Sequence, residues 1–520
     1  MATVDRDILT IVEPTIPLDE VFVEDQDSEE AKKKESPDNP DPAVKQQGME
    51  GGIYPMIQIG SMKVAQGDVS SMRLELDAFI PSMTIEISDG SNKLTDIEYP
   101  LDGTVVSLYL RPMPIDEYRP IRIDFDILNI SSMPGSQEEG GGSPPSYTFD
   151  CIMKVPLLYA DVLQGFSTGN SFDHLIECAE GLGLGFASND DGTDDEMPRV
   201  CAQQSRDEFI NLTTLTAYKD DESFFTSYID PHYYLCMVNI NKQFSMIDEM
   251  ETVSVGQQMP TDLQNNPEDE EEGDTTVEGS LRLSNGQDVA GSDMAISQYN
   301  LVNNSGAVWT QNGYARKVSY LNLNENNNGG ENNGSEEFLI TPLNTPGAEE
   351  NRIPLRGRIG DDFWKENNKC KYLGKQSSED FGNMHSNYMY AVGNNYGNMD
   401  EITKMVMEVD LEVVNWSLYR YQRIPVIIYN TGEVGNKGLE NRDEQLGEAE
   451  QPTNLSQEEK DEAGEYNTDD PNAEVKNEFL SGYYVISEIV YTYNKESTKI
   501  QQQLKLLRRE WPIPAQNEDN

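Results

Sequence analysis

The chain has 520 residues, a formal net charge of −55, and only 36% hydrophobic residues. A surface this acidic repels nucleic-acid phosphates and anionic lipids, which speaks against a sequence-specific DNA-binding protein and a membrane-surface protein. No stretch approaches the roughly 20 apolar residues that a spanning helix requires. We therefore expect a soluble protein of three or four domains with no membrane-spanning segment.

The first part of the chain divides into an arm and a β module. Residues 1–52 contain too little apolar surface to build a core, which predicts an extended N-terminal arm. Residues 53–160 contain strand patterns at 72–86, 104–111, 121–130 and 147–155. In the third of these, Ile121, Ile123 and Phe125 alternate with Asp124 and Asp126, so one face is predicted to be apolar and the other wet, as in an antiparallel sandwich or barrel.

Residues 161–247 predict a small α+β domain. Apolar residues at helical spacing predict a helix over 171–182, and Gly181 and Gly183 stop it. Ser205 and Glu208 form a predicted capping box, after which Phe209, Leu212 and Leu215 are expected to face a core. We also expect a third helix over 221–229 and a strand over 233–240.

The second half of the chain alternates between acidic segments and strands. Residues 248–399 predict an acidic linker followed by an Asn- and Gly-rich irregular insert with strand-like islands such as 315–323. Residues 400–514 predict a second β module, interrupted by an acidic insert over 431–478 and followed by a tail over 515–520. Within it, period-two runs joined by the polar residues 494–497 predict a hairpin over 482–511, whose mixed faces require partners on both sides.

No motif predicts catalysis or a bound cofactor. His174, His232 and His385 have no spaced carboxylate or cysteine partner, and His174 is interpreted as a solvated or capping residue. The glycines of the GLGLG run at 181–185 follow a helix instead of opening one, which is the wrong order for cradling phosphate. We therefore predict no catalytic residues and no cofactor.

A metal site is also not predicted. The acidic run at 189–196 has the oxygen ligands that calcium prefers, but its spacing fails the EF-hand pattern, so a solvated acidic loop is favoured over calcium. The cysteines lack CxxC spacing and are expected to be reduced structural thiols made in a cytosol; they are Cys151, Cys178, Cys201, Cys236 and Cys370.

The chain has 25 tyrosines, which raises the alternative of a sugar-stacking surface. Tyr483, Tyr484, Tyr491 and Tyr493 lie within strand patterns, where aromatic side chains are favoured for packing. Packing in a core or an interface is therefore the preferred interpretation.

Several stretches resemble one known family, the baseplate hub proteins of contractile, T4-like phage tails, which are related to the hub part of type VI secretion spike proteins. These stretches are NWSLYRYQRIPVIIY (415–429), SGYYVISEIVYTY (481–493), QQQLKLLRREWPIP (501–514) and, in the helical section, SFDHLIECAEGLGLGF, SRDEFINL and DDESFFTSYIDPHYYLCMVNI. The resemblance covers roughly residues 54–245 and 400–514 and consists of packing motifs.

The resemblance implies a mainly β, α+β fold in which residues 53–160 and 400–514 are two tube-like modules of the same shape. It further implies a homotrimer whose six modules adapt a hexameric tail tube to a trimeric central spike. Expected partners are the tube or tube-initiator protein, the spike protein, other baseplate proteins, and genomic DNA that passes without sequence-specific binding. The expected location is the virion tail baseplate, after assembly in the host cytoplasm. A tail-associated cell-wall-degrading enzyme and a carbohydrate-binding adhesin remain as alternatives.

Overall fold

The structure is a computed structural model. It describes residues 8–16, 55–90, 94, 100, 103–110, 121–133, 135, 144–245, 281–283, 294–304, 316–322, 335–340, 369–376, 384–403, 405–430, 475–476, 480–497 and 499–508. The acidic linker after 248, nearly all of the acidic insert over 431–478, the tail over 515–520 and most of the arm lie outside these residues. The predictions made for those segments therefore remain predictions.

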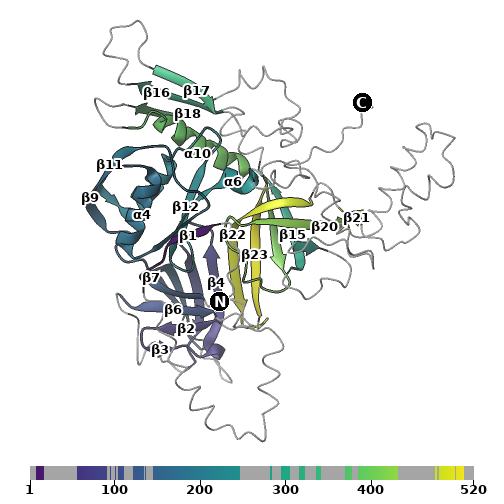
Figure 1. Cartoon of the computed structure of the whole chain (residues 1–520). Coiled ribbons are helices and arrows are strands. Elements are labelled where there is room, and N and C mark those ends of the chain that lie inside the picture. Colours follow the sequence, from purple (N-terminus) through teal and green to yellow (C-terminus); the bar gives the residue numbers. More distant parts are fainter. Residues whose placement is uncertain are drawn as a thin grey trace, which may run out of the picture.

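The first β module is a run of antiparallel strands at one end of a 14-stranded sheet (Figure 1). Its strands are β2 (Met56–Ile59), β3 (Met62–Lys63), β4 (Val69–Leu76), β5 (Ser82–Ser88), β6 (Val105–Leu110), β7 (Ile121–Met133) and β8 (Ser146–Met153). The predicted strand over 72–86 is therefore two strands, because the chain turns between Leu76 and Ser82. The alternation of β7 is confirmed: Ile121, Ile123 and Phe125 are buried, and Asp124 and Asp126 are half-buried on the other face.

The second set of strands occupies the other end of the same sheet. It consists of β14 (Leu281–Leu283), β15 (Ile296–Asn303), β19 (Met405–Leu411), β20 (Arg423–Asn430), β21 (Val475–Lys476), β22 (Gly482–Asn494) and β23 (Lys499–Leu507). The predicted hairpin is confirmed as β22 and β23, which pair from Val485 with Leu507 to Asn494 with Lys499.

The two sets are joined edge to edge in one sheet, through pairing of β22 with β4. β20 pairs only with the first residues of β22, from Gly482 to Val485, and the rest of that edge is available. β4 pairs with it from Ile489 opposite Leu76 to Asn494 opposite Ser71. An unpaired edge on a strand as long as β22 would leave backbone donors and acceptors unsatisfied, so pairing with β4 completes it.

The α+β domain lies beside this sheet. It contains a four-stranded sheet in the order β1-β10-β13-β12, a two-stranded ribbon and three helices. Their bounds are β1 (Leu9–Val12), β9 (Asp161–Gly169), α4 (Ser171–Leu182), β10 (Gly185–Ser188), β11 (Met197–Ser205), α5 (Arg206–Leu215), β12 (Phe225–Ile229), β13 (Tyr234–Asn239) and α6 (Ile240–Ser245).

Three local predictions in this domain are confirmed or corrected. The helix over 171–182 is confirmed as α4, which ends at Gly183 in the left-handed region. The helix expected over 221–229 is wrong, because residues 225–229 form β12 and pair with β13. The capping box is also wrong: Ser205 stands at the N-cap of α5, but its side chain makes no cap hydrogen bond. In α5, Phe209 is buried as predicted, but Leu212 is exposed.

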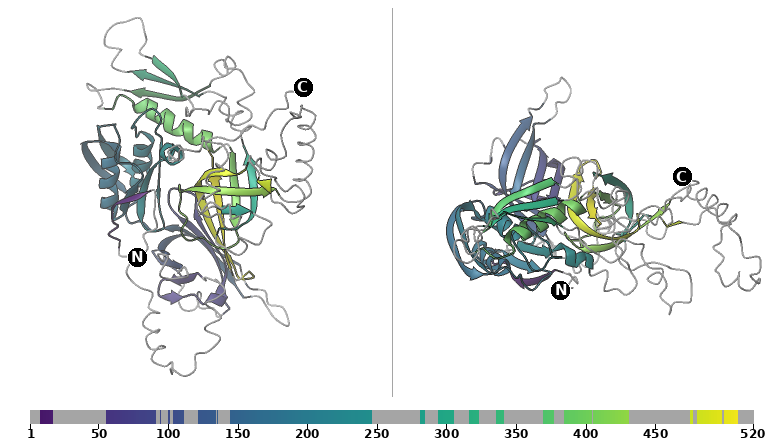
Figure 2. Two further views of the ribbon diagram at one scale, coloured as in Figure 1. Left: turned by 45° about the vertical axis from the view of Figure 1, so that its right-hand side comes forward. Right: turned by 90° about the horizontal axis from the view of Figure 1, so that it is seen from above.

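The described residues between 281 and 403 form strands and a helix, whereas the sequence predicts an irregular insert with strand-like islands. Strands β14 and β15 belong to the large sheet, and β16 (Arg316–Asn322), β17 (Ser335–Ile340) and β18 (Lys369–Gln376) form a sheet of their own. This small sheet packs on helix α10 (Tyr388–Ile402), as Figure 2 shows. The sequence does not predict this helix because some of its buried positions carry polar residues in place of apolar ones; these are Asn394, Asn395 and Asn398.

Two apolar clusters hold these parts together. The larger one runs from the first set of strands through α4 and α5 to the second set, including Leu74, Phe125, Leu175 and Tyr484. The other, including Phe224, Tyr228 and Val485, lies between the α+β sheet and the second set. β22 is therefore buried on both faces near its start, as predicted for the hairpin. The fold is mainly β and of the α+β class, as expected. In the described part of the chain, no helix has the length and apolar character needed to cross a bilayer.

Candidate interaction surface and a buried polar network

One face of the large sheet is polar over both sets of strands. In β4, Met72, Leu74 and Leu76 are buried in the core, whereas Arg73 and Glu75 on the opposite face are exposed or half-buried. The same alternation in β5, β8, β19 and β23 places polar residues on one side of the sheet. We call this surface the polar face.

The strand register makes the polar face continuous across the junction. One row of directly paired residues runs through Gln501, Thr492, Arg73, Thr84 and Asp150, which lie on β23, β22, β4, β5 and β8. Directly opposed residues on neighbouring strands share one face. Side chains of the two sets therefore form a single surface.

Polar side chains on this face bind one another. Arg73 pairs with Glu75 at 2.5 Å, and Lys505 donates to Glu488 at 2.7 Å. Asp150 accepts hydrogen bonds from Thr84 and Asn129, each at 3.3 Å. Carboxylates outnumber cations on the face: the carboxylates are Glu75, Glu86, Asp124, Asp126, Asp150, Glu408, Asp410 and Glu488, and the cations are Lys63, Arg73, Arg122, Lys154, Lys499 and Lys505.

The charges and hydrogen bonds of the polar face determine how strongly it can bind nucleic acid. A surface of mutually bonded polar groups offers few apolar contacts, and an excess of carboxylates repels phosphates. Nucleic acid gains affinity mainly when cations neutralise its phosphates and release counterions. The polar face therefore lacks the excess of cations with which proteins hold nucleic acid.

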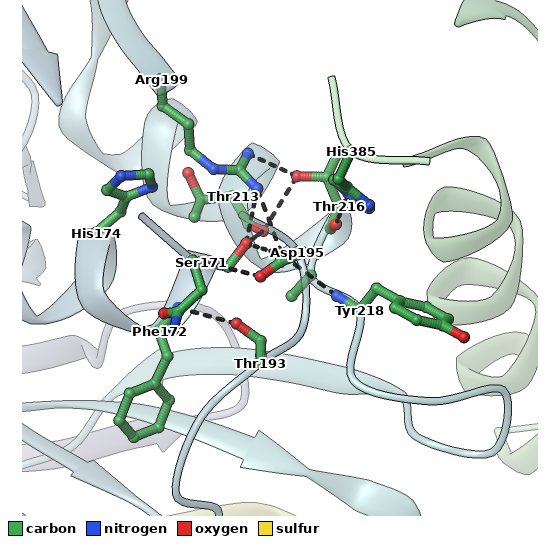
Figure 3. A network of polar contacts seen from close by, with 12 residues as sticks. Ser171, Phe172, His174, Thr193, Asp195, Arg199, Thr213, Thr216, Tyr218 and His385 are labelled. Carbon is green, nitrogen blue, oxygen red and sulfur yellow. Dashed lines mark hydrogen bonds and ion pairs between the residues drawn. The ribbon is translucent and has the colours of Figure 1, made fainter. Parts of the chain in front are cut away.

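A buried polar network lies in the α+β domain, away from the polar face (Figure 3). Asp195, with no exposed surface, accepts the backbone N–H of Ser171 at 2.9 Å and the hydroxyl of the same residue. Arg199 donates to the Ser171 hydroxyl at 2.7 Å and to the Thr216 hydroxyl at 2.8 Å, and its guanidinium lies 3.6 Å from the Asp195 carboxylate. The network therefore ties the start of α4 to the end of α5.

This network does not have the geometry of a hydrolytic site. Ser171 is completely buried, and in the described residues neither Ser171 nor Asp195 is hydrogen-bonded to a histidine. His385 donates instead from Nε2 to the Thr216 carbonyl at 3.0 Å, and burial lowers its pKa. The Ser171 hydroxyl therefore lacks both a histidine partner and access to solvent.

The other two histidines also lie apart from any such site. His174 is buried, which corrects the expectation of a solvated residue, and its Nε2 lies 2.9 Å from the Ser167 carbonyl. His232 follows Asp230, whose carboxylate accepts its backbone N–H at 2.9 Å. The structure thus brings none of the three histidines together.

The acidic run at 189–196 is partly buried, which corrects the prediction of a solvated loop. The Asp190 carboxylate accepts hydrogen bonds from the Lys219 ammonium and, at 2.9 Å, from the Asn239 side-chain amide. Asp195 accepts those from Ser171 described above. Among the described residues, no group of three or more His, Cys, Asp or Glu side chains has the arrangement of a metal site. These acids therefore act as hydrogen-bond acceptors within the domain.

The cysteines and the central tyrosines lie in the core. Cys151, Cys178, Cys201 and Cys236 are buried thiols, whereas the side chain of Cys370 lies outside the described residues. Burial raises the pKa of Cys151 to about 12 and that of Cys178 to about 11, so these thiols stay protonated at neutral pH. The tyrosines are predicted correctly as packing residues: Tyr483, Tyr484, Tyr491 and Tyr493 are all buried.

No family model matches the chain, and no curated protein matches it in sequence. Solved structures do match over most of its length. A tail protein of Neisseria meningitidis MC58 matches with a TM-score of 0.42 and 8% identity over 89% of this chain and 100% of the other. The 43 kDa tail protein of prophage MuSo2 from Shewanella oneidensis has a TM-score of 0.44 and 10% identity, covering 88% and 98% of the two chains.

An E. coli component of the type VI secretion system, described as similar in structure to T4 bacteriophage tail proteins, matches with a TM-score of 0.37 and 9% identity. That match covers 88% of this chain and 79% of the other. These three solved structures are thus described as two phage tail proteins and one component of a type VI secretion system.

Proposed function

We propose that the chain is a structural protein of the baseplate hub of a contractile phage tail. In this proposal three copies form a ring that adapts a hexameric tail tube to a trimeric central spike. The polar face lines the passage through which genomic DNA leaves the virion. No enzymatic activity is assigned to the chain.

The observation that carries the proposal is the continuity of the polar face across the two sets of strands. Because β4 and β22 pair directly, one chain presents two sets of strands side by side with their polar residues on one surface. Three such chains would present six sets, and the excess of carboxylates would keep DNA from binding as it passes. The sequence resemblance supports the same assignment.

The alternatives have less support from the described residues. A wall-degrading enzyme needs an accessible acid or nucleophile, and the Ser171–Asp195–Arg199 network is closed to solvent. An adhesin would need a group of exposed aromatic side chains for stacking on sugars. The tyrosines of β22 are core residues, and the exposed Tyr159, Tyr299 and Tyr396 lie on different elements: the segment before β9, β15 and α10. We therefore propose no second function.

The native mass of the purified chain tests the proposal, measured alone and after mixing with tube protein or spike protein. We expect a mass of three chains that increases with both partners. A single-chain mass that increases with neither would contradict the hub assignment. Lysis of cell walls in a turbidity assay would favour the enzyme, and glycan binding by an isolated monomer would favour the adhesin.

A further inference from the structure

The outer face of the β9–β11 ribbon carries apolar side chains that are exposed to solvent. Leu163 on β9 is 83% exposed, and Val200 on β11 is 61% exposed. On the opposite face, Phe166 of β9 and Cys201 of β11 are buried in the core. Figure 1 shows the ribbon on the side of the α+β domain away from β22 and β23. The inner face already attaches the ribbon to the domain, so packing within this chain does not account for the outer apolar residues.

The strand register places Leu163 and Val200 on either side of a glycine. Val200 is directly opposite Gly165, and Leu163 precedes Gly165 by two residues, so the three residues share one face of the ribbon. A Cβ on Gly165 would have no atom within 4 Å, so the space above the glycine is open. A gap between two apolar side chains can accept one apolar side chain of another molecule.

Two more exposed apolar residues, Leu157 and Tyr159, lie just before β9, on either side of the buried Leu158. Leu157 has a φ of +66°, in the left-handed region that residues with a Cβ rarely adopt. The Leu158 carbonyl accepts the N–H groups of Arg206 and Asp207 at 3.0 and 3.3 Å, which holds this segment against the start of α5. Strained backbone of this kind is concentrated at functional sites. We define the ribbon patch as Leu157, Tyr159, Leu163, Gly165 and Val200.

The basic residues near the ribbon patch do not give it a positive charge. Between Lys154 and Lys219 the sequence has two basic residues, Arg199 and Arg206. Both are buried, and Arg199 belongs to the polar network in the interior of the domain. Lys154 is paired with Asp126, 3.4 Å away. The cations of this part of the chain are therefore either turned inward or already paired.

The acidic residues near the ribbon patch face the solvent. Asp207 and Glu208 lie in the first turn of α5, half-buried and exposed respectively, and Glu196, directly before β11, is exposed. Burial and the negative charge of the Asp207 carboxylate raise the pKa of Tyr159, which places Asp207 beside the patch. An apolar surface with acidic flanks repels a second copy of itself and attracts a surface with basic flanks.

We propose that the ribbon patch is a docking surface for a different protein, one whose contact surface has an apolar side chain between lysine or arginine residues. The apolar side chain packs above Gly165, between Leu163 and Val200. The cations face Glu196 and Asp207, and these charges orient the partner. The site lies on a single chain and its occupant is another protein, so the inference does not depend on the proposed trimer.

Binding of a synthetic peptide to the full-length chain tests the docking surface. The probe alternates leucine with serine and has lysine at both ends. One control peptide has glutamate at both ends, and a second has serine in place of every leucine. Fluorescence anisotropy measures the affinities. We expect the probe to bind the parent chain and each control to bind at least about tenfold more weakly, because each lacks one of the two features that the patch recognises.

Two variants of the chain locate the binding. Leu163→Ser combined with Val200→Ser removes the apolar side chains, and Gly165→Gln fills the space between them. These positions are exposed, so the variants keep the fold. Each should lower the affinity for the probe by about tenfold or more. Leu128→Ser combined with Met133→Ser, at exposed apolar residues of β7, is the matched control and should bind the probe as the parent chain does.

Three results of the titrations would overturn the inference. The first is that the probe does not bind the parent chain. The second is equal affinity of the probe for the parent chain and the two patch variants, which would show that the acidic surface as a whole attracts it. The third is binding of the glutamate peptide as tight as that of the probe.

Native mass, measured over a concentration series, separates this inference from the proposed function. A mass of three chains for the parent and a smaller one for the Leu163→Ser, Val200→Ser variant would identify a second copy as the occupant, which refutes the inference and leaves the trimer intact. A single-chain mass for both, with selective binding of the probe, would support the inference and contradict the trimer.

Discussion

Arg199 and Asp195 form the most enclosed ion pair in the described residues, with side chains 5% and 0% exposed. Arg199 also donates hydrogen bonds to the hydroxyls of Ser171 and Thr216, and so links the start of α4 to the end of α5. On the polar face, by contrast, the Arg73–Glu75 pair is 50% and 30% exposed and competes with water. Similar charge pairs therefore contribute differently to stability in the two places.

We predict that Arg199→Ala lowers the free energy of unfolding by about 3–5 kcal/mol, because it leaves the Asp195 carboxylate buried without its cation. Arg73→Ala is the matched control at an exposed pair and should cost less than about 1 kcal/mol. Urea denaturation at one protein concentration measures both values. Equal losses in the two variants would show that the buried network does not hold α4 and α5 together.

His385 makes stability depend on pH. Burial lowers its pKa from the ordinary value near 6.5, so the folded protein keeps the imidazole neutral where the unfolded chain already protonates it. Because the unfolded state binds more protons in that window, the free energy of unfolding falls as pH falls from about 6.5 towards the lowered pKa. The contribution of His385 to the free energy of unfolding is fully present above pH 6.5, the ordinary pKa of histidine.

His385→Asn removes the titrating group and retains an N–H donor for the Thr216 carbonyl. We predict that the variant loses less stability than the parent chain as pH falls below about 6.5. Unfolding curves over a pH series measure this slope. Measurements at pH 8, where the imidazole is neutral in both states, give the packing loss separately. Parallel pH profiles for the two chains would contradict the assignment.

At the scale of elements, the two helix starts of the α+β domain look alike in sequence and differ in structure. Asn170 is the N-cap of α4, and its side chain accepts the Asp173 N–H at 2.8 Å. Ser205 occupies the same position at α5, but its hydroxyl binds the Asp207 carboxylate instead of a backbone N–H. Only the first side chain satisfies a free donor of its helix.

We predict that Asn170→Ala costs about 1 kcal/mol of unfolding free energy, which is typical for loss of a cap bond. Ser205→Ala should stay within about 0.5 kcal/mol of the parent, because no cap bond is lost. Thermal or urea unfolding of the two variants compares them directly. A larger loss for Ser205→Ala would mean that the predicted capping box forms after all.

Helix α10, which belongs to the insert, supplies hydrogen-bond donors to the end of α5 in the α+β domain. The Asn395 amide donates to the carbonyls of Leu215 and Ala217 at the end of α5, at 2.7 and 3.1 Å, and its oxygen accepts the Phe225 N–H at 2.9 Å. Carbonyls at a helix end lack partners in their own helix. The insert is therefore part of the domain's structure.

At the scale of the whole molecule, the proposed function makes the charge of the polar face the property that keeps DNA from binding. Asp150→Lys combined with Glu86→Lys replaces two carboxylates with cations on neighbouring strands. We predict that the assembled variant retains DNA at low salt, and that retention falls steeply as salt rises, as counterion release requires. The parent assembly should retain little DNA under the same conditions.

Glu177→Lys combined with Glu180→Lys is the matched control, because it makes the same charge change at exposed positions of α4. Gel retardation of double-stranded DNA over a salt series compares the two variants. If both retain DNA equally, net charge alone explains the effect and the polar face has no special exposure to DNA.

The sequence alone determined the features set by local periodicity and composition. The β22–β23 hairpin, the wet and dry faces of β7 and the helix over 171–182 follow from side-chain spacing within single segments. The burial of the strand tyrosines was likewise visible in the pattern of residues.

Only the tertiary structure decided how these segments meet. Whether β22 ends a module or continues into β4 depends on which edge is left uncovered by β20, and no local pattern encodes that choice. Asp190 and Asp195 looked solvated because their partners, Lys219 and Arg199, become neighbours only after folding. The sequence predicts a helix at residues 225–229, but these residues form a strand because they pair with β13, and this pairing is not visible in the local sequence. Burial, edge pairing and the joined polar face are non-local properties, so the chain fixes them only when it is folded.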